Sequence, residues 1–262
     1  MTLLKHEIKM NLKALLIWTL CMGILCAGCI LLFKSLEEGM RDMADAYSNM
    51  GAFSTALGMD KLNISTLEGF YATEIALMFA IGGAMFAAMT GAAMLSKEEE
   101  GHTSEFLYTL PMRRGAIILS KYAAVVLLVF LYNLMTVLLI LAGFAGIGEM
   151  PDWKTFLLYH VAQLVMQLEI GSVCFFISAA SKRRQLGACV GFAMVLYMAD
   201  LMCRIIPDLE NLKYVTPYYF SNGADIFASG QLERGMAVIS LAVTFFSVIA
   251  AAAVYVRRDL HS

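Results

Sequence analysis

Four polar residues within the apolar stretch 155–180 have the types and spacing that could do chemistry. At 100° per helical residue, His160, Gln163 and Gln167 fall within about 60° of arc, whereas Glu169 points to the opposite face. A buried polar group is costly among apolar neighbours, so we expect the stripe to face protein or a wet cavity. It could hydrogen-bond to another helix or contact a substrate. Glu169, as a lone acid, needs a partner or a proton.

The sequence motifs of the common catalytic sites are absent. The chain has no HExxH, no GxSxG and no GxxxxGK[ST], so it is not expected to hydrolyse ATP through a phosphate-binding loop. Its six cysteines all lie in apolar stretches; Cys26 and Cys29 have CxxC spacing, but the second Cys or His pair of a zinc site is absent, so the cysteines are expected to be small hydrophobic filler. We therefore expect no catalytic residue, no metal site and no cofactor in this chain.

The composition places the chain in a membrane. Of its 262 residues, 60% are hydrophobic and only 15% are charged, and the mean hydropathy is +0.72. A soluble domain has about 25% charged residues, so this chain has too little charge to cover a water-facing surface. The net charge of −2 leaves no basic field for a nucleic acid. These values argue against a soluble enzyme, a disordered regulator and a nucleic-acid binder.

Six apolar stretches are each long enough to cross a bilayer, which needs about 20 residues in a helix. They are residues 14–33, 75–95, 122–146, 155–180, 185–206 and 236–256. Lipid offers no partner for backbone groups, so the sequence predicts an all-α integral membrane protein with six transmembrane helices and a single domain over residues 1–262. The first span ends without a small-residue cleavage site, so we expect it to be a span and not a signal peptide.

Most of the 19 Lys and Arg residues lie in alternate connecting segments, namely both ends of the chain and the segments near residues 96–121 and 181–184. Because basic segments stay inside, the N- and C-termini are predicted to be cytoplasmic. Residues 1–13 are predicted to be an amphipathic helix on the cytoplasmic membrane surface, with Leu4, Ile8 and Leu12 on its apolar face. The alternative is a solvated helix start whose periodicity is accidental.

Two other patterns predict local packing. In the second span, Gly83, Ala87 and Gly91 form a face of small residues that favours close contact with another helix, either in this chain or in a second copy. Asp200 and Arg204 are spaced i, i+4 and can pair near the outer end of the fifth span.

The external segment 207–235 is expected to dip into the membrane edge without spanning it. It is rich in aromatic residues and broken by prolines and a glycine. Its candidates for the outer mouth are Tyr218, Tyr219 and Phe220.

The segment 96–121 is the largest cytoplasmic loop. Residues 103–110 can form two helical turns that Pro111 ends, with Phe106, Leu107 and Leu110 on one face. A short helix at the tips of two spans would act as a rigid lever, since a partner that pushes it moves both spans. The alternative is an ordinary solvated loop.

This loop resembles the signature that follows the second span of ABC-2-type transporter permeases, which serve bacterial bacitracin, bacteriocin, sodium and drug exporters. Its motif positions are Lys97, Glu98, Glu99, Glu100, Gly101, Glu105, Phe106, Leu107, Thr109, Leu110, Pro111, Arg113, Arg114 and Lys121. Residues 214–230 resemble the family's "Pro-x-x-Tyr-Phe … Asp-Ile" external segment, and residues 255–260 resemble its aromatic-x-Arg-Arg-Asp-Leu ending. His102, Thr103 and Ser104 depart from the Thr-Leu that is usual after the glycine.

The resemblance implies a permease subunit worked by a separate cytosolic ABC ATPase, which binds ATP and Mg²⁺. The loop would be the cytoplasmic coupling helix between spans 2 and 3. The residues implied in coupling are Glu98, Glu99, Glu100, Gly101, Thr103, Glu105, Phe106, Leu107, Leu110, Pro111, Arg113 and Arg114. A second permease copy, identical or paralogous, would complete an exporter in a bacterial cell membrane. The expected cargo is hydrophobic or amphipathic, such as an antimicrobial or toxin-like peptide or a drug.

Two other functions stay open from the residues alone. An ion-coupled secondary transporter could use Glu169 as a proton site, although no clear inverted repeat is present. An intramembrane enzyme could use His160 or Glu169, but their opposite helix faces disfavour a joint site.

Overall fold

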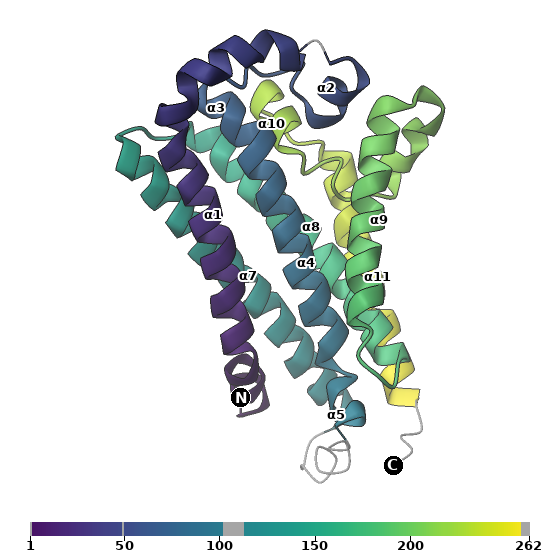
Figure 1. Ribbon diagram of the computed structural model, residues 1–262. Coiled ribbons are helices and arrows are strands. Elements are labelled where there is room, and N and C mark those ends of the chain that lie inside the picture. The colour runs from purple at the N-terminus through teal and green to yellow at the C-terminus, as the bar shows by residue number, and fades with distance from the viewer. Residues whose placement is uncertain (1, 49, 102–112, 258–262) are drawn as a thin grey trace.

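The computed structural model describes residues 2–48, 50–101 and 113–257, and they are arranged as a bundle of helices (Figure 1). The helices are α1 (Thr2–Ser48), α2 (Ala52–Leu57), α3 (Leu67–Phe70), a π-helical turn (Tyr71–Ile75), α4 (Ala76–Met94), α5 (Lys97–Glu100), α7 (Arg114–Ile147), α8 (Trp153–Ala180), α9 (Leu186–Ile205), a 3-10 helix (Pro207–Tyr214), α10 (Gly223–Ser229) and α11 (Arg234–Arg257). Within these ranges there is no strand, so the predicted all-α fold is confirmed.

Among the described residues, six helical segments are long and apolar enough to cross a membrane, as predicted. They are Leu3–Glu37, Leu67–Met94, Arg114–Ile147, Trp153–Ala180, Leu186–Ile205 and Arg234–Arg257. Most of them extend past the apolar stretches seen in the sequence, because a helix continues through polar turns at either end of its apolar part. In Figure 1 the start of α1, α5 and the end of α11 lie at one end of the bundle, which we call the base; α2, α3 and α10 lie at the far end.

The N-terminal segment is continuous with the first span. Residues 2–13 are helical, but they are the first turns of the continuous helix α1. The face that packs on the bundle carries Leu3 and Glu7, which are buried, whereas Leu12 on the predicted apolar face is exposed. Leu4 and Ile8, also on the predicted apolar face, are half-buried, and the placement of this face on a membrane surface stays a prediction.

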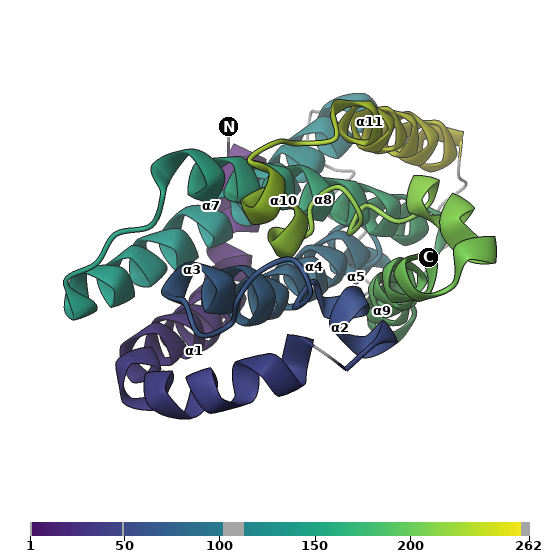
Figure 2. The same cartoon turned by 90° about the horizontal axis from the view of Figure 1, so that it is seen from above.

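The helices α4 and α8 lie at the centre of the bundle (Figure 2). They pack along each other closely, because the small residues of α4 face α8. A Cβ atom added to Gly83 would lie 2.2 Å from the Gln167 side chain, and one added to Gly91 would lie 2.3 Å from the Gly171 carbonyl oxygen. The small-residue face is thus used inside this chain, which decides between the two alternatives that the sequence left open.

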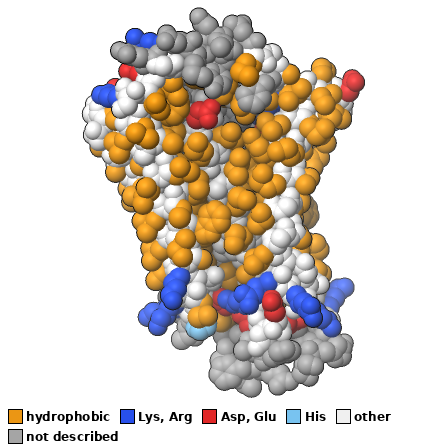
Figure 3. Space-filling view, viewed as in Figure 1, with side chains coloured by type: hydrophobic (Ala, Val, Ile, Leu, Met, Phe, Trp, Pro, Cys, Tyr) orange, Lys and Arg blue, Asp and Glu red, His pale blue; other side chains and the backbone are white. Residues whose placement is uncertain are grey.

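The outer helices cover this centre and present apolar side chains outward. α1 packs along α7, and α11 packs along α8. Much of α11 remains exposed, including its apolar residues Val238, Leu241, Phe245, Phe246 and Ile249. The face drawn in Figure 3 is apolar across the body of the bundle, and Lys and Arg side chains gather towards the base.

The segment between α9 and α11 returns into the bundle. After the 3-10 helix, residues 216–223 lie against α4, α8 and α9, and α10 follows. A Cβ atom on Gly223 would lie 2.5 Å from the Ala72 carbonyl oxygen, so only glycine permits this approach. The ring of Phe227 packs on those of Tyr71 and Tyr159, at centroid distances of 5.6 and 6.2 Å.

Candidate functional site

A buried network of charges joins four elements at the base. Lys121 of α7 is 0% exposed; its ammonium donates hydrogen bonds to Glu7 Oε1 at 2.8 Å, to the Met94 carbonyl at 2.9 Å and to Glu98. Lys97 pairs with the other oxygen of Glu7, which is 1% exposed. Two carboxylates and two ammonium groups thus form a neutral cluster. It ties the start of α1 to the end of α4, to α5 and to α7.

Further contacts hold the segments around α5 in place. The Ser178 hydroxyl of α8 accepts hydrogen bonds from the backbone amides of Leu95 and Ser96, each at 3.1 Å. The backbone amide and Nε of Arg184 both donate to Glu100 Oε2 at 2.9 Å, and these bonds lower the pKa of Glu100. The connection between α4 and α5 is therefore fixed to α8 and to the turn after it.

The residues implied in coupling fall into two groups. Thr103, Glu105, Phe106, Leu107, Leu110 and Pro111 lie outside the described residues. Of the others, Glu98 bonds to Lys121 and Glu100 bonds to Arg184, while Gly101 and Arg113 are exposed. Glu99 is half-buried. Arg114, also exposed, donates from Nη1 to the Val256 carbonyl at 3.0 Å and so links α7 to the end of α11.

The polar stripe of α8 makes hydrogen bonds to three other segments. His160 Nε2 lies 2.9 Å from the Tyr71 hydroxyl. Gln163 Nε2 donates to the Ser221 carbonyl at 2.7 Å, and Gln167 Oε1 accepts from Asn133 Nδ2 of α7 at 2.7 Å. The stripe therefore faces protein, as predicted. It joins α8 to the π-helical turn before α4, to residues 216–223 and to α7.

Glu169 lies on the other side of α8, towards α11. It is buried, and it lines a small cavity of about 10 Å³ together with Ser240 of α11 and Thr216. Within the described part of the chain, its Oε2 atom has no hydrogen-bond partner. The structure thus separates this acid from His160, as the helix periodicity indicated.

A second charge network lies at the far end. Asp200 and Arg204 pair as predicted, with Nε 3.0 Å from each carboxylate oxygen. Arg204 Nη1 also donates to Asp225 of α10 at 2.6 Å, and Lys61 donates to the same carboxylate at 2.5 Å. Burial raises the pKa of Asp225, but the charges and hydrogen bonds of Arg204 and Lys61 outweigh it and hold that pKa below its ordinary value.

The three outer-mouth candidates lie beside this network. Tyr218 and Phe220 are buried, whereas Tyr219 is half-buried. The guanidinium of Arg204 lies 4.7 Å from the centre of the Tyr219 ring and donates to the Tyr219 carbonyl at 3.2 Å. The network therefore holds residues 216–223 as well as α9, α10 and the loop that contains Lys61.

A family model described as "ABC-2 family transporter protein" matches residues 1–260. The chain belongs to the ABC-2 transporter family. It is thus a multi-pass membrane protein of the permease class, a transport component and not itself catalytic. No curated protein matches the chain. The resemblance of the loop, the external segment and the C-terminal residues to ABC-2 permeases is confirmed at the level of the family.

In this ABC-2 permease, the residues that sequence reasoning missed are the distant partners of its charges. Glu7 and Lys121 are 114 positions apart, and Lys61 and Asp225 are 164 positions apart. The sequence pattern did not indicate Glu7, because the burial of Leu3 and Leu15 on its helix face is seen only in the structure.

Proposed function

We propose that this chain is the membrane subunit of an ATP-driven exporter, moved by a separate cytosolic ABC ATPase that engages the loop between α5 and α7. The observation that supports this proposal is the buried charge network at the base. The network links Glu7, Lys97, Glu98 and Lys121, so both flanks of the loop are bound to the start of α1. A force on the loop would move α1, α4 and α7 together.

The base is the cytoplasmic side in this proposal. Basic residues gather there on the face shown in Figure 3, and positively charged segments are retained in the cytoplasm. The coupling helix would comprise residues 103–110, with Phe106, Leu107 and Leu110 seated in a groove of the ATPase. The expected location is a bacterial cell membrane.

Transport would follow alternating access. Closure of two ATPase subunits on ATP and Mg²⁺ would draw the loops of two permease copies together, and the spans would repack to open outward. Hydrolysis would reset them. The second copy would be identical or paralogous.

The cargo would be hydrophobic or amphipathic, such as a peptide or a drug. His160, Gln163, Gln167 and Glu169 are the candidates for polar contacts along the path. Tyr218, Tyr219 and Phe220 are the candidates for the outer mouth.

The test is co-purification of the permease with a protein that carries a GxxxxGK[ST] phosphate-binding loop. Replacing Phe106 and Leu107 by Asp should release that protein while the permease stays inserted. Tyr214 and Val215 form a matched aromatic–aliphatic pair, exposed at the far end, and their replacement by Asp should leave the complex intact. Equal recovery of the ATPase with both double variants would contradict the coupling role of the loop.

A further inference from the structure

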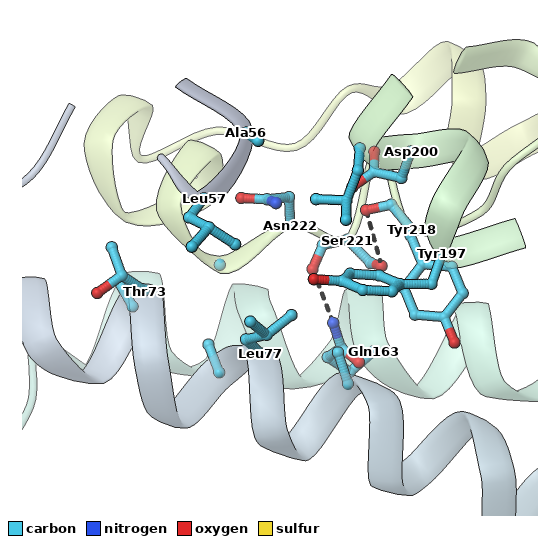
Figure 4. A pocket seen from close by; sticks show the side chains of 15 residues that line it. Ala56, Leu57, Thr73, Leu77, Gln163, Tyr197, Asp200, Tyr218, Ser221 and Asn222 are labelled. Atoms are coloured by element: carbon cyan, nitrogen blue, oxygen red, sulfur yellow. Dashed lines mark hydrogen bonds between the residues drawn. The ribbon is translucent and has the colours of Figure 1, made fainter. Parts of the chain in front are cut away.

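A small cavity lies within the far half of the bundle, beneath α2 (Figure 4). It has a volume of about 30 Å³. Its polar lining comes from α8, α9, the π-helical turn before α4 and the returning segment: Gln163, Asp200, Tyr218, Ser221, Asn222 and Thr73. Apolar residues of α2 and α4, such as Leu57 and Leu77, form the rest of its wall.

Two of the lining side chains carry polar atoms without a hydrogen-bond partner among the described residues. They are Gln163 Oε1 and the Tyr218 hydroxyl. Gln163 is 1% exposed and Tyr218 is 4% exposed, so bulk water does not reach them freely. The amide nitrogen of Gln163 is held by the Ser221 carbonyl, as the dashed line in Figure 4 shows, which fixes Oε1 as the remaining acceptor.

Both the size and the chemistry of the cavity fit water. A buried water needs about 10–15 Å³ and two to four polar partners. The volume of about 30 Å³ therefore accommodates one or two water molecules and nothing as large as a cargo side chain. Among the described residues no cluster of His, Cys, Asp and Glu could hold a metal ion, so a metal ion is not the expected occupant.

We propose that this cavity binds one or two ordered water molecules, which donate to Gln163 Oε1 and bond to the Tyr218 hydroxyl. One helical turn further along α8, Gln167 Nε2 also lacks a partner among the described residues, as does Asn133 Oδ1 of α7, but neither residue lines this cavity. On the outer side, Asp200 connects the cavity to the charge network of Arg204, Asp225 and Lys61. This inference rests on the cavity and its polar atoms, not on the ATPase or on the direction of transport.

The first experiment is X-ray footprinting of the full chain in lipid nanodiscs. X-rays produce hydroxyl radicals from bound water in place, so a buried side chain next to ordered water is oxidised faster than one in a dry interior. Tyr159 is the internal control, because it is 0% exposed and its hydroxyl donates to the Ala76 carbonyl at 2.6 Å. Oxidation of Tyr218 several-fold faster than Tyr159 is expected. Equal rates at the two tyrosines would overturn the proposal.

The second experiment uses Tyr218→Phe, which removes only the hydroxyl. If water bonds to that hydroxyl, the substitution removes a hydrogen bond and lowers the midpoint of thermal unfolding. If the cavity is dry, the hydroxyl is an unsatisfied buried group, and its removal leaves the midpoint unchanged or raises it. A lowered midpoint supports the water site, and an unchanged or raised midpoint contradicts it.

Discussion

The most informative perturbation of the base is Lys121→Met, which removes the ammonium group and keeps a long apolar side chain. Lys121 is fully buried, and its ammonium lies 2.8 Å from Glu7 Oε1. At that distance, and at an effective dielectric constant of about 20, the attraction between the two charges is about 6 kcal/mol. Desolvation of the pair offsets part of this attraction. The substitution leaves Glu7 and Glu98 facing one Lys97, so the neutral cluster becomes an acidic one.

Breaking a buried pair by removing one partner costs about 3–5 kcal/mol. For a chain of this length, that lowers the midpoint of thermal unfolding by on the order of 10 °C. The assay is intrinsic-fluorescence unfolding of the purified permease in detergent. The matched control is Lys34→Met, since Lys34 makes only exposed contacts, an ion pair with Glu149 at 3.7 Å and a hydrogen bond to the Ile147 carbonyl at 2.8 Å, and such exposed pairs contribute about 1 kcal/mol or less.

A second substitution separates the loss of charge balance from the loss of packing. Glu7→Gln combined with Lys121→Met restores a neutral cluster, so the double variant should be more stable than Lys121→Met alone. If Lys121→Met shifts the midpoint no more than Lys34→Met does, the network does not hold the base together. If the double variant is no better than Lys121→Met, packing and not charge explains the loss.

Three further predictions concern the centre and the far end. Gly91→Ala should destabilise the chain by about 1–3 kcal/mol in the same unfolding assay, because its Cβ would lie 2.3 Å from the Gly171 carbonyl oxygen. The control is Gly28→Ala, whose Cβ would meet nothing within 4 Å and which should not destabilise the chain. The pKa of Asp225 is held below its ordinary 3.8, so its ionised carboxylate stabilises the fold above that pH, and this stabilisation is lost as the pH falls through the lowered pKa. The difference in unfolding midpoint between wild type and Asp225→Asn should therefore shrink only below pH 3.8. A difference that already shrinks nearer neutral pH would refute this. Glu169→Gln should impair transport by the proposed complex with the ATPase, measured as cargo flux into vesicles, whereas wild-type transport across pH would make the acid structural.

The six spans and the helical fold could be predicted from the sequence, because a bilayer demands long apolar helices and leaves few alternatives. Helix ends were less predictable. The apolar stretch 122–146 marks only part of α7, which begins at Arg114, and the stretch 75–95 omits the turns from Leu67 that precede α4. Apolar composition indicates only the part of a helix that is kept from water. Backbone hydrogen bonds let the same helix continue beyond that part, through polar residues.

The candidate site was predictable only where its residues are close in sequence. The i, i+4 spacing gave the Asp200–Arg204 pair, and helix periodicity separated Glu169 from the stripe that begins at His160. The partners of Lys121 could not be found in this way, because one of them, Glu7, lies on a different helix. A lysine near the end of a span can either keep its connecting segment in the cytoplasm or form a buried ion pair with another helix. Composition alone does not distinguish these two roles.

The two kinds of polar contact in the permease differ in the free energy needed to separate them. Charge networks bind the base and the far end, and separating a buried charge pair costs several kcal/mol. Between them, α8 is joined to its neighbours by neutral bonds such as Gln163 to Ser221 and Gln167 to Asn133, which contribute on the order of 1 kcal/mol each. If the spans repack as in the proposed alternating access, the neutral bonds along α8 should therefore break first. The start of α1, the end of α4 and the start of α7 should move as one body.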